Sequence, residues 1–207
     1  MKLFSHINKK IILASQSPRR KHLLEEILKD TGIILETVSY NFTETIPQII
    51  SPEEISKQIA KDKATSLLEQ YPHLQQHIII TADTLVFANS RILGKPLSNK
   101  QAIEFLQILS NNTHKVVSAV YITTKDFNRI IVDTALVKFS KLSEDTIQWY
   151  VDKYSPLDKA GAYGIQEWIG YVGIEKIDGS FYTVMGLPTH KIYQVLEEYD
   201  SLQITKI

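Results

Sequence analysis

The sequence contains no cysteine among its 207 residues. This absence excludes disulfides, thiolate-bound zinc and cysteine nucleophiles, and it is typical of proteins from a reducing compartment. Long apolar runs are also missing, since every run is far shorter than the roughly 20 residues of a membrane-spanning helix. The basic start, MKLFSHINKK, is not followed by the apolar segment of a secretory signal. These absences predict a cytoplasmic protein with no membrane partner.

The sequence also lacks an excess of either charge. Lys and Arg together number 23, as do Asp and Glu, which gives a formal net charge of zero. A nucleic-acid-binding protein usually carries a basic face, so we expect no nucleic-acid partner. Any bound anion must therefore be held by a local cluster of cations.

What is present is a chain of strands and helices. Apolar, β-branched runs alternate with segments of helical periodicity, which predicts an α/β fold with a mixed sheet and flanking helices, in one compact unit or two lobes. We expect strands at 11–14, 33–40, 77–87, 91–93, 113–124 and 129–139, and helices at 18–30, 52–70, 101–109, 144–154 and 188–199. Serine N-caps are expected at Ser17, Ser51, Ser98 and Ser143. The segment 171–184 is predicted to form a hairpin around Asp178 and Gly179.

Residues 13–20, LASQSPRR, place two serines, a proline and two arginines directly after the first strand. The first turn of a helix has unpaired N–H groups and a partial positive charge, so arginines are unfavourable there unless an anion binds. We interpret this turn, with Arg19 and Arg20, as one wall of a polyphosphate site. The alternative is that the arginines face solvent or pair with Glu25 or Glu26. The glycines and lysine of a P-loop are missing.

Asp83 interrupts the apolar strand 77–87. A buried carboxylate is costly unless it meets a cation, a metal ion or a hydrogen-bond donor. In open α/β folds, the carboxyl edge of a sheet is also where active sites form. The alternative is that Asp83 lies at the strand end and only caps a loop.

Two lysines occupy unusual positions. Lys63 takes one step of a helical stripe formed by Ile55, Ile59 and Leu67, so it either extends outward to solvent or reaches a buried anion. Lys95 lies in the turn Gly-Lys-Pro, which can hold an ammonium in place, although turns are also often simply polar.

Glu44 and Asp83 together would supply the two oxygen ligands that a magnesium ion usually takes from a protein. The six histidines show no paired metal-binding spacing. We expect His114, which precedes a strand, to have a hydrogen-bonded structural role.

Taken together, these segments resemble the Maf family of nucleoside triphosphate pyrophosphatases. The motifs LASQSPRRKHLL, KDKA, TADTLV, GKP, LDKAGAYGIQ and GSFYTVMGLP occur in the order of the family and cover almost the whole chain. The chain departs from the family in SNNTHKVVSAV, where Ser-Gly and a threonine are usual, and before Val184, where an asparagine is usual. The resemblance implies a single Maf-like domain over 1–207, with a fold like that of inosine triphosphate pyrophosphatases: a curved mixed sheet and two lobes around a cleft.

The resemblance also implies roles for individual residues. Asp83 matches the proton acceptor of the family. The residues that match its polar cleft are Ser15, Arg19, Arg20, Glu44, Lys63 and Lys95. Those that match positions associated with substrate choice are Arg19, Thr84 and Gln166. The form GAYGIQ is similar to the branch that acts on dTTP and UTP, and the amide of Gln166 offers the donor and acceptor that a pyrimidine imide requires.

The activity implied by the resemblance is hydrolysis of dTTP and UTP to the monophosphate and pyrophosphate with Mg²⁺ or Mn²⁺, which would prevent incorporation of unwanted nucleotides. A homodimer is implied as well. The alternative function is a non-catalytic nucleotide-binding regulator of septum formation and cell division. Such a sensor would bind a triphosphate without releasing pyrophosphate, and its function would survive the loss of Asp83.

Overall fold

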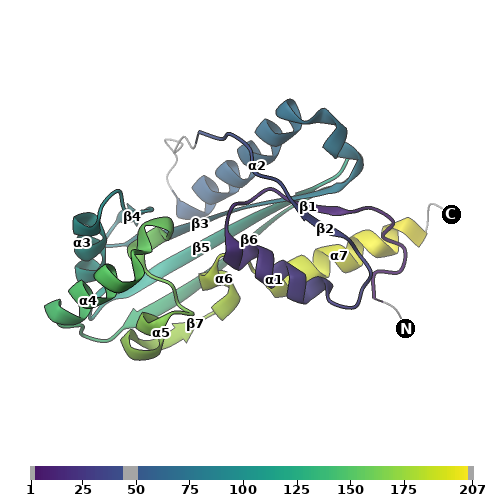
Figure 1. Cartoon of the computed structure of the whole chain (residues 1–207). Helices are drawn as coiled ribbons and strands as arrows, with labels where there is room; N and C mark the ends of the chain where they lie inside the picture. Colours follow the sequence, from purple (N-terminus) through teal and green to yellow (C-terminus); the bar gives the residue numbers. More distant parts are fainter. Residues whose placement is uncertain (1–2, 44–50, 205–207) are drawn as a thin grey trace. The chain divides into compact units, whose positions relative to one another are not determined.

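A computed structural model describes residues 3–43 and 51–204 of the chain, and its centre is one mixed sheet. The strands are β1 (Ile11–Leu13), β2 (Leu35–Thr37), β3 (Ile78–Ala88), β4 (Arg91–Leu93), β5 (Thr113–Thr123), β6 (Asn128–Phe139) and β7 (Ile174–Asp178). Their order is β2-β1-β3-β5-β6-β7, with β4 paired to β3 (Figure 1). β1 is parallel to β2 and β3, whereas β4 is antiparallel to β3 and β7 to β6. The predicted mixed α/β fold is confirmed.

The five predicted helices each begin within two residues of the expected start, whereas the short helices at 168–173 and 181–185 were not predicted. The helices are α1 (Pro18–Leu28), α2 (Pro52–Gln70), α3 (Asn99–Leu109), α4 (Glu144–Tyr154), α5 (Trp168–Gly173), α6 (Phe181–Met185) and α7 (Thr189–Ile204), with 3₁₀ turns η1 (Pro72–Gln76), η2 (Pro156–Asp158) and η3 (Ala160–Ala162). The four predicted serine N-caps are confirmed, because each accepts a hydrogen bond from a backbone N–H of the first turn. Within the described part of the chain, the helices are all too short or too polar to cross a membrane.

The chain forms two compact units. Unit 1 comprises Met1–Asp83, Ala119–Val132 and Gly186–Ile207, and unit 2 comprises Thr84–Ser118 and Asp133–Met185. The long strands β3, β5 and β6 each supply residues to both units. The single Maf-like domain over 1–207 stays a prediction.

Unit 1 carries helices on both faces of its part of the sheet. The connections β1–α1–β2 and β2–α2–β3 cross the sheet in opposite directions, and right-handed crossovers then place α1 and α2 on opposite faces. Figure 1 shows this arrangement, with α7 beside α1. Both faces of β1 and of the start of β3 are therefore covered, and all six residues Ile11 to Leu13 and Ile78 to Ile80 are buried.

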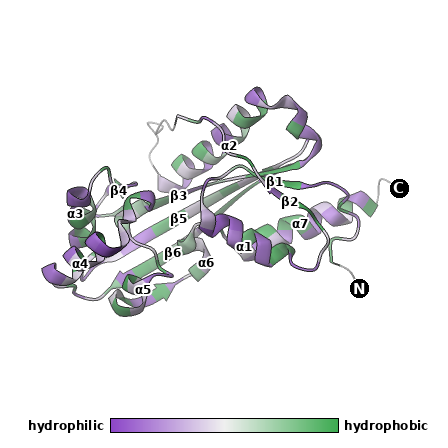
Figure 2. Ribbon diagram, viewed as in Figure 1, coloured by the Kyte–Doolittle hydropathy of each residue, from purple (hydrophilic) through white to green (hydrophobic). Residues whose placement is uncertain are grey.

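Unit 2 has its own hydrophobic core. α3 and α4 pack together, and their inner faces bury residues such as Leu106 and Tyr150 against Phe139 of β6. Figure 2 shows hydrophilic residues on the remaining faces of both helices. This core supports the loop between α4 and α5, which contains the GAYGIQ motif.

The predicted hairpin over 171–184 is wrong. Only residues 174–178 form a strand, β7, which pairs with β6. After Gly179, the carbonyl of Ser180 accepts hydrogen bonds from the N–H groups of Thr183 and Val184, which starts helix α6. The buried Thr183 side chain donates to Asp133 on β6. Tertiary hydrogen bonding thus overrides the strand propensity of the FYTV residues.

Candidate functional site

The turn after β1 is fixed against β3 by backbone hydrogen bonds. Ala14 N–H donates to Ile80 O at 2.9 Å. The Ser15 hydroxyl then accepts from Ser17 N–H at 3.2 Å, and the Ser17 hydroxyl caps α1 by accepting from Arg20 N–H. The first turn of α1 is therefore held at the carboxyl end of the parallel strand β1, where ligands bind in open α/β sheets.

Arg20 lies within this turn and contacts the protein itself. Its Nε donates to Gly186 O at 3.0 Å, and Nη1 donates to Ala82 O at 2.9 Å and more weakly to Ser15 Oγ at 3.5 Å. Arg20 thus does not simply face solvent, because its guanidinium donates to a carbonyl of β3 and to one just before α7. Arg19 beside it is half-buried. Phosphate binding by these arginines stays a prediction.

Asp83 is a buried carboxylate within β3 and not a loop cap at the strand end. The residue is 4% exposed, and Oδ1 accepts from Lys63 Nζ at 2.7 Å. Its Oδ2 is buried and has no hydrogen-bond partner among the described residues. An unsatisfied buried oxygen of this kind is unusual and indicates a place for water, a metal ion or a ligand.

Lys63 reaches the buried anion and does not extend to solvent. Besides Asp83, its ammonium lies 3.5 Å from Ala82 O and 5.7 Å from the centre of the Phe42 ring. Its backbone carbonyl accepts from the Tyr40 hydroxyl at 2.6 Å. The segment before residue 44 thus helps to hold Lys63 against β3.

Unit 1 therefore brings together four of the predicted site residues: Ser15, Arg20, Lys63 and Asp83. Ala82 O accepts from both Arg20 and Lys63, so one β3 residue connects the two cations. Glu44 lies outside the described residues. Arg19 also belongs to unit 1, whereas Thr84, Lys95 and Gln166 belong to unit 2.

Thr84 begins a chain of two hydrogen bonds that the sequence did not predict. Its Oγ1 lies 2.9 Å from Ser118 Oγ, and Ser118 in turn donates to Thr183 O at 2.8 Å. Ser118 and Thr183 are fully buried. A polar residue such as Ser118 within the apolar run VVSAV was the available indication, since a buried hydroxyl must find a partner.

The turn that contains Lys95 is linked to the GAYGIQ loop by a backbone hydrogen bond. Gly161 N–H donates to Gly94 O at 3.1 Å, although the Lys95 side chain itself is exposed. In the same loop, the side-chain oxygen Oε1 of Gln166 is buried and has no hydrogen-bond partner in the described part of the chain. Gln166 therefore offers an acceptor that these residues leave unsatisfied.

His114 confirms its predicted structural role. It is buried in β5, and its Nε2 lies 2.7 Å from the Tyr163 hydroxyl, with which it shares a hydrogen bond. Burial lowers the pKa of His114 to about 4, so the ring is neutral near pH 7.

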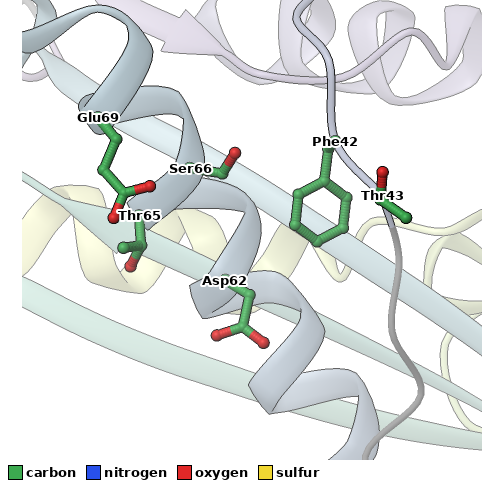
Figure 3. Close-up of a pocket in the computed structure, with 6 residues that line it drawn as sticks. All are labelled: Phe42, Thr43, Asp62, Thr65, Ser66 and Glu69. Atoms are coloured by element: carbon green, nitrogen blue, oxygen red, sulfur yellow. The ribbon is translucent and has the colours of Figure 1, made fainter.

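A separate pocket of about 260 Å³ lies beside α2 in unit 1. Its lining residues are Phe42, Thr43, Asp62, Thr65, Ser66 and Glu69, which Figure 3 shows on the two sides of the opening. The two carboxylates would repel a triphosphate, and none of the predicted site residues lines it. We do not assign this pocket to the anion site.

The geometry describes an α/β protein with a cationic turn and a buried carboxylate on adjacent parallel strands. Residues 10–199 match the family described as Maf-like protein, so the chain belongs to the Maf family. It is 42% identical over 189 residues to the dTTP/UTP pyrophosphatase of Bacteroides fragilis strain YCH46, covering 91% of this chain and 95% of the relative. It is 43% identical over 190 residues to the dTTP/UTP pyrophosphatase of Parabacteroides distasonis, covering 92% and 96%.

A solved structure shares the fold. The HAM1 protein from Coxiella burnetii aligns with a TM-score of 0.51 over 92% of this chain and 99% of the other, at 15% sequence identity. At that identity the likeness concerns the fold alone.

Proposed function

We propose that the protein hydrolyses a nucleoside triphosphate to the monophosphate and pyrophosphate, and that dTTP and UTP are its substrates. Membership of the Maf family and the names of relatives about 42% identical support the activity. The structural observation that carries the proposal is the buried Asp83 carboxylate, with one oxygen paired to Lys63 and the other unpartnered among the described residues.

The cations of unit 1 divide into two roles. Arg20, through its bonds to Ala82 O and Gly186 O, orients the first turn of α1. That turn presents Arg19 and backbone N–H groups to the triphosphate, whose negative charge they stabilise. Lys63 orients Asp83. In this scheme catalysis depends mostly on positioning and on neutralisation of charge.

The chemistry centres on the Oδ2 atom of Asp83. A water oxygen forms a bond to the α-phosphorus while the bond from this phosphorus to the bridging oxygen of the β-phosphate breaks. Pyrophosphate leaves with the electron pair of that bond, and the proton of the water passes to a carboxylate oxygen. Asp83 has Oδ1 occupied by Lys63, so Oδ2 is the atom that accepts the proton or contacts a metal ion.

A divalent metal ion fits the donors at this site. Oδ2 of Asp83 is a hard, unpartnered oxygen of the type that Mg²⁺ and Mn²⁺ prefer, and Glu44 is the second residue proposed to hold the ion. When bound, the ion would neutralise phosphate charge and lower the pKa of a water molecule.

Base selection is assigned to Gln166. Its unpartnered Oε1 suits the N3–H donor of a uracil or thymine ring, while its amide N–H₂ suits a neighbouring ring carbonyl. Cytosine has no N–H at that ring position, so it would satisfy this acceptor less well.

The test measures pyrophosphate release from dTTP, UTP, CTP, GTP, ATP and 7-methyl-GTP, with Mg²⁺, with Mn²⁺ and with chelator. We expect metal-dependent release from dTTP and UTP. Pyrophosphate release from nucleotides with other bases would still support the hydrolase activity but would contradict the role of Gln166. Triphosphate binding without release from any nucleotide would contradict the enzyme and favour the regulator of cell division.

Cytoplasmic location and a homodimer complete the proposal. The first rests on the absence of cysteine and of long apolar runs, and the second on the family resemblance. Cell fractionation would test the location. Light scattering of the purified chain would test the oligomeric state, and a monomer at micromolar concentration would contradict the dimer.

A further inference from the structure

The residue proposed to select the base lies in a tight turn of unit 2. Glu167 N–H donates to Gly164 O at 2.9 Å, which closes a four-residue turn with Gln166 at its third position. The direction of the Gln166 side chain therefore depends on how the two ends of this turn, Gly164 and Glu167, are held.

A single buried hydroxyl contacts both ends. Tyr150 OH accepts from Gly164 N–H at 3.1 Å and donates to Glu167 Oε2 at 2.5 Å. Tyr150 is fully buried on α4, and burial, followed by the hydrogen bond to Glu167, raises its pKa. The hydroxyl therefore keeps the proton that it donates.

A buried ammonium holds the other oxygen of the same carboxylate. Lys159 Nζ lies 3.0 Å from Glu167 Oε1 and 2.7 Å from Asp158 Oδ1. The Lys159 side chain is 9% exposed and that of Glu167 19%, whereas Asp158 is 58% exposed. An ion pair this deep requires both partners in place, because either charge alone would be costly to bury.

Gly164, which has no side chain, leaves space for the Glu167 carboxylate. A Cβ atom on Gly164 would lie 2.6 Å from the Glu167 carboxyl carbon, which is closer than van der Waals contact. Since Lys159 and Tyr150 hold both carboxyl oxygens, the carboxylate has little freedom to move away. A side chain at residue 164 would therefore push the Glu167 carboxylate away from its contacts with Lys159 and Tyr150.

We propose that Tyr150, Lys159 and Glu167 are positioning residues that orient the Gln166 amide and thereby set the preference for a pyrimidine imide. The inference rests on the function proposed for Gln166. The three residues act through the turn, and the structure gives them no part in the phosphate chemistry of unit 1.

The experiment compares kcat/KM for dTTP with kcat/KM for dCTP in Glu167→Gln and Tyr150→Phe. Tyr150→Phe removes the hydrogen bonds to both ends of the turn, and Glu167→Gln removes the charge that pairs with Lys159. We therefore expect the dTTP:dCTP ratio to fall about three- to tenfold in each variant. Tyr150→Phe keeps the charge pair with Lys159, which makes it the second variant if Glu167→Gln folds poorly. Glu175→Gln is the matched control, since Glu175 on β7 forms an exposed ion pair with Lys138 on β6.

A purely structural role would lower the melting temperature or the active fraction and leave the ratio unchanged, which would overturn the inference. Gln166→Ala is measured on the same substrates to separate the two proposals. If Gln166→Ala changes the ratio but the positioning variants do not, the role of Gln166 stands and the positioning role is wrong. If Gln166→Ala leaves the ratio unchanged, both are wrong.

Discussion

At the scale of single residues, the most unusual feature is the buried carboxylate of Asp83. One carboxylate oxygen is paired with an ammonium and the other lacks a partner in the described part of the chain. A protein that needed Asp83 only for stability would gain little from such an arrangement, because a buried ion pair is often no better than well-packed apolar residues. The unpartnered oxygen therefore points to function more than to folding.

Asp83→Asn should abolish pyrophosphate release while the protein remains folded. The amide cannot accept a proton and is a poor metal ligand, so we expect a loss of about 100-fold or more in kcat. Asp62→Asn is the control: Asp62 directly precedes Lys63 on α2, and this variant should retain activity. A folded Asp83→Asn variant with near-normal turnover would contradict the scheme, and partial recovery at high Mn²⁺ would identify Asp83 as a metal ligand.

At the scale of elements, α1 connects the fold to the site. Ser17 caps the helix, and its first turn contains Arg19 and Arg20. Arg20 binds the carbonyls of Ala82 and Gly186, so three segments far apart in sequence are joined at one helix start. The cap therefore affects both the stability of α1 and the placement of the arginines.

Ser17→Ala should lower stability and weaken substrate binding together. Loss of an N-cap costs about 1 kcal/mol of unfolding free energy, and a frayed first turn should raise KM for dTTP. Ser143→Ala removes the cap of α4 and should cost a similar amount of stability without changing KM. Urea unfolding and steady-state kinetics of both variants are the measurements. An unchanged KM in Ser17→Ala would show that the Ser17 cap does not affect substrate binding, which would contradict this prediction.

At the scale of the whole molecule, charge is balanced, and several ion pairs among the described residues are exposed. Pairs such as Lys10 with Glu36 and Lys138 with Glu175 are solvated and each contribute little to stability. His114 is different, because it is buried beside Tyr163 with its pKa lowered to about 4. The unfolded chain takes up this proton more readily than the folded protein does, which couples folding to pH.

The unfolding free energy should therefore fall as the pH decreases from about 6.5 to about 4. Across that window His114 is protonated in the unfolded chain but neutral in the fold, and the full effect is on the order of 3 kcal/mol. Urea titrations of wild type and His114→Gln at several pH values measure it. The variant should lose this part of the pH dependence, so parallel curves for the two proteins would contradict the assignment.

The sequence by itself determined the elements whose causes are local. The serine caps and the buried strands follow from propensity and periodicity within a few residues. It also identified Asp83 and Lys63 separately, because each polar residue interrupts an apolar pattern. The hairpin expected at Asp178 and Gly179 failed because β7 pairs with β6 and Thr183 binds Asp133, which are contacts that no local pattern contains.

Only the tertiary structure decided which of these residues meet. The crossover from α2 to β3 brings Lys63 to Asp83, and the packing of α4 brings Tyr150 to the turn that carries Gln166. Partners of buried polar groups are chosen by the path of the backbone, since a buried charge or hydroxyl binds whatever group the fold places within reach. Sequence can therefore name the residues that need partners, while the fold supplies the partners.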